Sequence, residues 1–411
     1  MMYTRNLKDG LLAAAQDTPV VLLNGARQTG KSTLLGMFDP THKAHIISLD
    51  DLTVLQAIRN NAQAFLAGLQ GERIIIDEVQ RAPELFLPLK EVVDRRRQPG
   101  RFFLTGSANV LMLPKLADSL AGRMEIATLW PLSQGELRGR KESFIDLAFS
   151  KERLPSITAC SQQELFQMLE MGGYPEVMTR SDPKRRVAWF HSYINTILQR
   201  DVQDLSKIEG LAALPNLLTL LASRAGGLLN AADLSRSLGL TNPTFQRYLN
   251  LLIAVFLVVS ITPWFTNLGK RLVKAPKLYL SDTGLLCHLL GIDHNSFAEN
   301  RNLLGPVLEN FVVMELLKQS GWSEQRAQLS HYRTHTGQEV DIVLESGQQV
   351  VGIEIKSASR LTSDHFKGLR HLREELGQRF HRGVILYSGR EVVQLEDKIW
   401  AAPVSILWEK A

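Results

Sequence analysis

The feature that most constrains this chain is a short glycine-containing segment, residues 25–32, that follows an apolar run. Residues 19–24 are rich in Val and Leu and predict a buried strand. Residues 25–32 match Gly-x-x-x-x-Gly-Lys-Ser, in which glycines let successive N–H groups surround phosphates at a helix N-terminus. Lys31 would reach the β- and γ-phosphates, and Ser32 would hold Mg²⁺. The segment therefore predicts a nucleoside triphosphate site.

A second buried strand carries the acids that such a site needs. Residues 73–76 are mostly apolar, and Asp77 and Glu78 follow them. Strands buried on both faces are continuously apolar, and ligands bind at the carboxyl ends of parallel strands. We expect Asp77 to bind the Mg²⁺ shell through water and Glu78 to act as general base on the attacking water. Two solvated carboxylates at a strand end are the alternative.

Three further strands are predicted near these two, at residues 45–49, 101–104 and 124–129. The second of them ends in a polar turn, from which either Ser107 or Asn109 is expected to sense the γ-phosphate. A helix cap or a simple turn is the alternative for each residue. The predicted ATP-binding residues are Gly25, Ala26, Arg27, Gln28, Thr29, Gly30, Lys31, Ser32, Thr33, Asp77 and Ser107.

Charge and composition constrain the chain more weakly. The net charge is +5, and basic residues cluster at 95–97, 184–186 and 270–274, which favours a polyanionic partner. No apolar run reaches the ~18 residues of a membrane span, and no signal peptide is visible. The two cysteines are far apart and support neither a disulfide framework nor a zinc site. We therefore expect a cytoplasmic protein with no membrane partner.

Several motifs together resemble a known family. They are residues 25–33, Ile-Asp-Glu-Val-Gln at 76–80, Leu-Thr-Gly-Ser at 104–107, and Ser-Leu-Ala-Gly-Arg at 119–123 followed by Trp-Pro-Leu-Ser. The set resembles prokaryotic AAA+ ATPases of the AAA_14/DUF4143 family over essentially the whole chain. The resemblance implies an AAA+ core that uses ATP and Mg²⁺ in a homo-oligomer, such as a hexameric ring. It makes Arg123 the candidate for stabilising transition-state charge, in cis or in trans; a surface salt bridge is the alternative.

The middle of the chain predicts a helical lid, which ends in a long helix over 187–205, and then a winged helix. Helices are expected over 211–225, 231–238 and from residue 242, followed by a strand hairpin with a basic turn. One interpretation is contact with DNA; the other is a packing or protein-interaction module. The predicted DNA-binding residues are Thr244, Gln246 and Arg247 at the bases, and Lys270, Arg271 and Lys274 at phosphates.

The last part of the chain predicts a second site. Asp341 lies in an alternating strand, Glu354-x-Lys356 lies in the returning strand, and Glu309 lies in a preceding helix. This arrangement resembles PD-(D/E)xK nucleases. Asp341 and Glu354, joined by Glu309, would coordinate Mg²⁺, and Lys356 would orient the bound water or stabilise charge on phosphate. A fold retained without cleavage is the alternative.

The sequence thus predicts an α/β protein in four parts. They are a P-loop AAA+ core with a parallel sheet (1–130), a helical lid and linker (131–205), a winged helix (206–285) and a PD-(D/E)xK-like α/β domain (286–411). The leading interpretation is ATP-driven remodelling, translocation or branched-DNA processing, in repair, recombination or defence. The alternative is a nucleotide-gated switch that binds a protein partner or promoter DNA without cleavage. The expected catalytic residues are Lys31, Glu78, Arg123 and Lys356.

Overall fold

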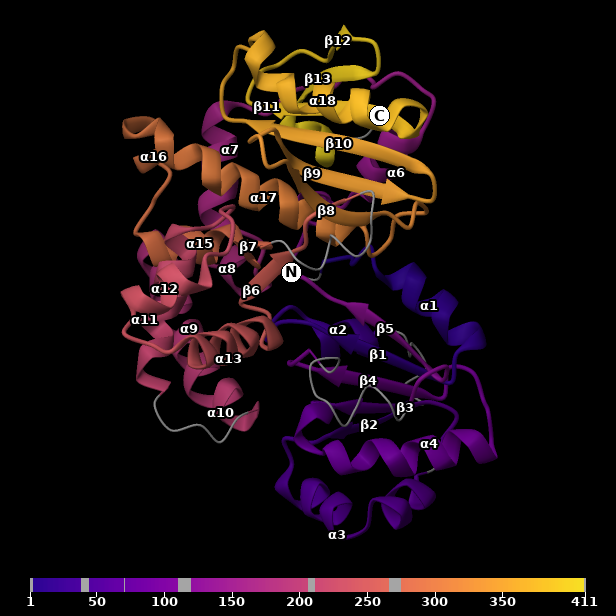
Figure 1. The fold of residues 1–411 in the computed structure, drawn as a ribbon. Coiled ribbons are helices and arrows are strands. Elements are labelled where there is room, and N and C mark those ends of the chain that lie inside the picture. The colour runs from indigo at the N-terminus through magenta and orange to yellow at the C-terminus, as the bar shows by residue number, and fades with distance from the viewer. Residues whose placement is uncertain are drawn as a thin grey trace.

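The computed structural model describes residues 3–37, 44–69, 71–109, 120–205, 211–265 and 275–409. Figure 1 shows two sheets in different parts of the molecule, with a helical region beside them. The N-terminal sheet lies at the bottom of that view, and the C-terminal sheet lies at the top. In these described ranges, no helix is long and apolar enough to cross a membrane.

The N-terminal sheet is five-stranded and parallel, in the order β2-β3-β4-β1-β5. Its strands are β1 (Val20–Asn24), β2 (His45–Ser48), β3 (Ile74–Asp77), β4 (Phe102–Gly106) and β5 (Met124–Thr128). Alternate residues of β1 enter two different clusters, because successive side chains of a strand point to opposite faces. Helices α1 (Lys8–Asp17) and α2 (Lys31–Gly36) cover one face, and α3 (Leu52–Gly68) and α4 (Phe86–Arg95) cover the other. The predicted α/β fold with a parallel sheet is confirmed.

The region between the sheets is helical. It contains α5 (Gln134–Leu137), α6 (Phe144–Phe149), α7 (Gln162–Met171), α8 (Pro175–Met178), α9 (Pro183–Thr196) and α10 (Val202–Leu205). A π-helical turn, Ile197–Asp201, joins α9 to α10. The helix predicted over 187–205 therefore begins earlier than expected, where Asp182 caps α9 by accepting a hydrogen bond from the Lys184 amide.

The winged-helix pattern follows in α11 (Leu214–Ser223), α12 (Ala231–Ser237), α13 (Asn242–Ala254), β6 (Val258–Ile261) and β7 (Lys277–Leu280). Strands β6 and β7 pair antiparallel, with Ile261 opposite Lys277. An isolated bridge also pairs Leu228 with Lys277. The predicted basic turn lies outside the described residues.

The C-terminal sheet is six-stranded and mixed, in the order β12-β13-β11-β10-β9-β8. Its strands are β8 (Gln328–Arg333), β9 (Glu339–Ser346), β10 (Gln349–Lys356), β11 (Phe380–Tyr387), β12 (Val393–Glu396) and β13 (Ile399–Pro403). The accompanying helices are α15 (Thr283–Leu290), α16 (Ser296–Glu299), α17 (Leu304–Gln319) and α18 (Lys367–Leu376). Helices α17 and α18 pack on opposite faces of this sheet, in separate hydrophobic clusters.

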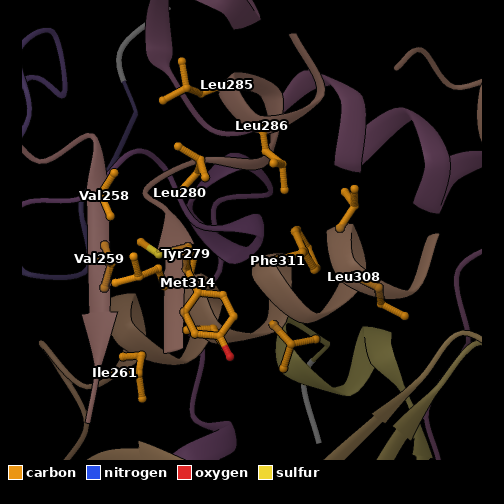
Figure 2. Packing of buried hydrophobic residues seen from close by; sticks show 14 of the residues in the cluster. Val258, Val259, Ile261, Tyr279, Leu280, Leu285, Leu286, Leu308, Phe311 and Met314 are labelled. Carbon is orange, nitrogen blue, oxygen red and sulfur yellow. The ribbon is translucent and has the colours of Figure 1, made fainter. Parts of the chain in front are cut away.

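One hydrophobic cluster joins the helical region, the winged-helix elements and one face of the C-terminal sheet. It includes Leu217, Phe245, Tyr279, Phe311 and Ile353. Figure 2 shows side chains of β6, β7, α15 and α17 from this cluster packing around one another. The predicted parts beyond residue 130 therefore share a core, and their domain limits stay a prediction.

Candidate functional site

The phosphate-binding loop lies between β1 and α2, and its backbone needs the two glycines of the motif. Gly25 has φ 144° and Gly30 has φ 93°, in the range that favours glycine. A Cβ atom on Gly25 would lie 2.2 Å from the carbonyl oxygen of Leu129. Arg5 fixes the loop from outside, since its Nη1 donates to the Thr29 carbonyl at 2.7 Å. The two glycines and Arg5 therefore set the shape of the loop.

Lys31 occupies the interior of this loop. Its Nζ donates to the carbonyl oxygens of Gly25 at 2.9 Å and Ala26 at 3.0 Å. Burial lowers the pKa of Lys31, while the carboxylates of Glu78 and Asp77 oppose that shift. The ammonium thus has neutral partners that phosphate oxygens can replace.

The residues expected to hold Mg²⁺ are adjacent. Ser32 Oγ donates to the Asp77 carboxylate at 3.1 and 3.0 Å, and the Thr105 hydroxyl donates to the same carboxylate. Hydroxyl and carboxylate oxygens are the hard ligands that Mg²⁺ takes, so Ser32 and Asp77 fit the ion. Mg²⁺ would supply charge neutralisation to the phosphates. Sequence reasoning missed Thr105, which is brought here by the pairing of β3 with β4.

Glu78 is held by two side chains. Its Oε2 accepts a hydrogen bond from Ser107 Oγ at 2.8 Å and another from Gln80, whose Nε2 also donates to Ser107 at 2.9 Å. Burial would raise the pKa of Glu78, but the ammonium of Lys31 and these two hydrogen bonds lower it. Glu78 has φ 61°, which is uncommon for a residue other than glycine and typical of functional sites. The Glu78 carboxylate is therefore ionised and held in one position, as a general base requires.

Of the two γ-phosphate sensor candidates, Ser107 is the one whose side chain joins the site. The backbone amide of Asn109 donates to the carbonyl of Ala254 at 2.7 Å, and its role as a sensor stays a prediction. Ala254 is the last residue of α13. Gln80, which sequence reasoning passed over, is the final residue of the Ile-Asp-Glu-Val-Gln motif.

The π-helical turn Ile197–Asp201 contributes charged groups to the edge of the site. Arg27 Nε lies 3.3 Å from Asp201 Oδ2, and Arg200 Nη2 lies 3.3 Å from Asp50 Oδ1. The Tyr193 hydroxyl also donates to the Arg27 carbonyl at 3.2 Å. The sequence singled out no lid residue, because a π-helical turn against the phosphate loop leaves no periodicity that would reveal it.

A cavity of ≈ 370 Å³ opens beside the phosphate loop. Most of its lining is apolar: Tyr3, Leu34, Met37, Leu132 and Pro175. Polar groups of Arg5, Thr29 and Thr33 complete the wall nearest the loop. Its position and its aromatic and aliphatic walls suit a nucleotide base, and none of the apolar residues belonged to the predicted set.

Arg123 lies far from the phosphate loop of its own chain. It precedes β5, whose first residue, Met124, is paired with Val20 at the start of β1, whereas the loop follows the end of β1. The two ends are roughly 16 Å apart at the usual rise per residue. The guanidinium pairs with Asp94, with Nη2 donating to Oδ2 at 3.1 Å. A role in cis does not fit this placement, and a role in trans stays a prediction.

The predicted DNA-contacting residues are only partly described. Gln246 and Arg247 are exposed on α13, and Thr244 is half-buried with its hydroxyl 2.9 Å from that of Thr241. Lys270, Arg271 and Lys274 lie outside the described residues. DNA contact stays a prediction.

In the C-terminal sheet, Asp341, Glu354 and Lys356 come together as predicted from their strands. Lys356 Nζ lies 2.7 Å from Glu354 Oε2 and 3.9 Å from Asp341 Oδ2. Asp341 Oδ2 also accepts a hydrogen bond from the Ile355 amide at 2.8 Å. Burial raises the pKa of Glu354, and the Asp341 carboxylate adds to that shift.

Sequence reasoning missed a second lysine in this cluster. Lys277 Nζ lies 2.9 Å from Glu309 Oε1, 2.7 Å from Glu339 Oε1 and 3.8 Å from Asp341 Oδ1. Across the described parts of the chain, no group of three or more His, Cys, Asp or Glu residues is arranged to hold a metal ion. With an ammonium among them, these carboxylates do not fit Mg²⁺, and cleavage through Lys356 stays a prediction.

Comparison with known proteins connects this geometry to a family. An AAA domain profile, AAA_14, matches residues 17–138, and a domain of unknown function, DUF4143, matches 304–407. The uncharacterized protein Rv2008c of Mycobacterium tuberculosis is 34% identical over 404 residues, which cover 98% of this chain and 84% of that protein. This chain belongs to the AAA_14/DUF4143 family. It is a P-loop ATPase, as the resemblance implied.

Other comparisons match further parts of this AAA_14/DUF4143 ATPase. A second domain of unknown function, DUF8612, matches residues 162–296, so DUF4143 covers only the end of the chain. The uncharacterized protein MJ1544 of Methanocaldococcus jannaschii is 24% identical over 277 residues, covering 66% of this chain and 57% of that protein. The Walker-type ATPase PABY2304 of Pyrococcus abyssi is 17% identical, with a TM-score of 0.45, covering 70% of this chain and 96% of that structure.

Proposed function

We propose that this ATPase acts on DNA through its winged helix. The observation that carries the proposal is the hydrogen bond from the Asn109 amide to the Ala254 carbonyl at 2.7 Å. It joins the end of β4, which also positions Ser107 at Glu78, to the last residue of α13. Helix α13 exposes Gln246 and Arg247, the side-chain types that contact bases and phosphates. A change at the γ-phosphate would therefore reach the helix that we expect to bind DNA.

The nucleotide is proposed to span the loop and the neighbouring cavity. Lys31 and the loop amides would bind the phosphates, Ser32 and Asp77 would hold Mg²⁺, and the base would enter the apolar cavity beside Tyr3 and Pro175. Glu78 would take the proton of the attacking water while Ser107 and Gln80 hold its carboxylate. The loop and the cavity are continuous, as a nucleotide that spans both of them requires.

We also propose a homo-oligomer, in which Arg123, half-buried at the far end of the sheet and paired with Asp94, would serve a neighbour's nucleotide. In that arrangement its guanidinium would exchange Asp94 for the transition-state charge of the adjacent chain. DNA remodelling, translocation or processing of branched DNA in repair, recombination or defence are the activities that such an assembly would serve. Cleavage is not part of this proposal, since Lys277 occupies the acidic cluster.

A second function is favoured by the charged groups around the π-helical turn. The pairs Arg27–Asp201 and Arg200–Asp50 join the nucleotide site to the helical region, in which partner binding could be gated. A nucleotide-gated switch would use these pairs to report whether ATP is bound. Very slow turnover with retained ADP would favour the switch over a DNA-driven motor.

The test is ATP turnover with and without duplex, single-stranded and four-way-junction DNA. Wild type is compared with Glu78→Gln, with Gln246→Ala and Arg247→Ala on α13, and with Arg59→Ala, an exposed basic residue of α3 that serves as the matched control. We expect DNA to stimulate wild-type and Arg59→Ala turnover, and the α13 variants to lose that stimulation while keeping basal turnover. Basal turnover that no DNA changes, together with no DNA binding, would contradict the DNA proposal.

A further inference from the structure

Lys277 is a cation built into the acidic cluster of the C-terminal sheet. It is the first residue of β7, and its side chain is 3% exposed. Its ammonium contacts carboxylates from two other elements: Glu309 on α17, and Glu339 and Asp341 on β9. An ammonium has three protons to donate, and here carboxylates surround them.

The position of this ammonium is set by backbone pairing. Lys277 is opposite Ile261 of β6 and also forms an isolated bridge with Leu228, so backbone pairing on both sides positions its Cα. Tyr279, two residues along β7, lies on the same side and its hydroxyl donates to Glu309 Oε1 at 2.8 Å. The winged-helix hairpin therefore holds both donors against the cluster.

Glu309, Glu339 and Asp341 carry the oxygen ligands that a divalent metal takes, and a divalent ion would need the space that the ammonium fills. Two like charges cannot share such a site without mutual repulsion. Lys356 does not play this part, because it is 28% exposed and pairs with Glu354 at 2.7 Å on the other side of Asp341. The two lysines thus divide the cluster, and Lys277 is the more deeply buried of the two.

We propose that Lys277 serves as the internal cation of this acidic cluster, and that the cluster takes up no divalent metal while β7 is seated on α17 and β9. The inference stands apart from the DNA proposal, because metal uptake is measured without DNA or nucleotide.

The experiment uses Mn²⁺ alone with the full, nucleotide-free chain. Wild type, Lys277→Met and the matched control Lys356→Met are compared by calorimetric titration and by thermal unfolding with and without Mn²⁺. We expect wild type and Lys356→Met to bind no Mn²⁺ tightly at the cluster. We expect Lys277→Met to melt lower without metal, to bind about one Mn²⁺ per chain, and to regain thermal stability when Mn²⁺ is added, since a ligand that binds only the folded state stabilises it.

Two results would overturn the inference. One is a folded Lys277→Met, checked by circular dichroism, that gains no Mn²⁺ site. The other is tight Mn²⁺ binding by wild type that is lost in Asp341→Asn, which would show that the ammonium does not exclude metal. When Lys277→Met folds poorly without metal, recovery of its folded circular dichroism signal on addition of Mn²⁺ supports the inference, and failure to recover overturns it.

Discussion

Each sheet carries a site built from lysines and carboxylates, but the two sites pair these groups differently. In the N-terminal sheet, the Lys31 ammonium donates to backbone carbonyls, while Asp77 and Glu78 accept hydrogen bonds from neutral side chains. In the C-terminal sheet, the ammonium groups of Lys277 and Lys356 are paired directly with carboxylates.

The difference shows that a motif specifies ligands, whereas the fold decides whether they are free to bind. Lysine and acid at the ends of neighbouring strands hold ATP and Mg²⁺ only where the lysine is kept from the acid. A glycine-lined loop does this in the first site. In the second site, the part of the chain that the structure describes places no such loop between the lysines and the acids, and a strand from the winged helix adds another cation.

The largest effect is expected from Glu78→Gln. Replacing the ionised carboxylate removes the general base, so ATP turnover should fall by about 10²- to 10⁴-fold while ATP binding is kept. Turnover and nucleotide affinity are measured in parallel, with Lys31→Ala as the variant that loses binding. Turnover within about threefold of wild type would show that the first site does not depend on a free carboxylate.

The next effect tests the second site. Lys277→Met should lower the free energy of unfolding by about 3–5 kcal/mol, because it leaves buried carboxylates without their cation. Lys356→Met should cost less, about 1 kcal/mol, since its ammonium is partly solvated. Urea unfolding in metal-free buffer measures both. Equal losses for the two lysines would contradict the division of the cluster.

A smaller effect is expected at the joint between the nucleotide site and the helical region. Asp201→Asn removes a negative charge that attracts Arg27 and lies near the phosphate loop, so ATP should bind about fivefold tighter. Asp364→Asn, an exposed acid of the C-terminal part, serves as control. Unchanged ATP affinity in Asp201→Asn would remove the support for the switch.

The last effect concerns Glu142, a buried carboxyl that pairs with no cation among the described residues. Burial, with the Glu315 carboxylate, raises the pKa of Glu142 from 4.5 to about 7. The folded state then binds more protons than the unfolded state between these values, so stability falls as pH rises through that window. Glu142→Gln should flatten this slope by on the order of 1 kcal/mol per pH unit. Urea midpoints from pH 5 to 8, compared with wild type, check it.

The sequence was most informative for functional residues that are close together along the chain. The apolar run, the glycine loop and Lys31 are local, and β1, the loop and α2 lie where they were predicted. Asp77 and Glu78 could be predicted for the same reason, because they directly follow a buried strand whose carboxyl end lies at the ligand-binding edge of the sheet. In the C-terminal sheet, the strands that bear Asp341 and Glu354 were likewise visible as an alternating pattern.

The missed residues act through tertiary contacts. Thr105 and Gln80 reach the acids only because β3 pairs with β4 and a 3₁₀ turn follows Glu78. Lys277 is brought to Glu309 from a strand in another part of the chain, and the one signal was a lysine opening an apolar strand. Asp201 is placed at the site by a π-helical turn, which leaves no periodic pattern in the sequence.

The most direct test of the contrast between the two sites is the Mn²⁺ stoichiometry of the wild-type chain, by electron paramagnetic resonance, with and without a non-hydrolysable ATP analogue. The contrast predicts no tightly bound Mn²⁺ without nucleotide and about one per chain with it, held at Ser32 and Asp77. Tight binding of Mn²⁺ without nucleotide, or a second ion when the analogue is present, would contradict the claim that the C-terminal carboxylates are already occupied by lysine.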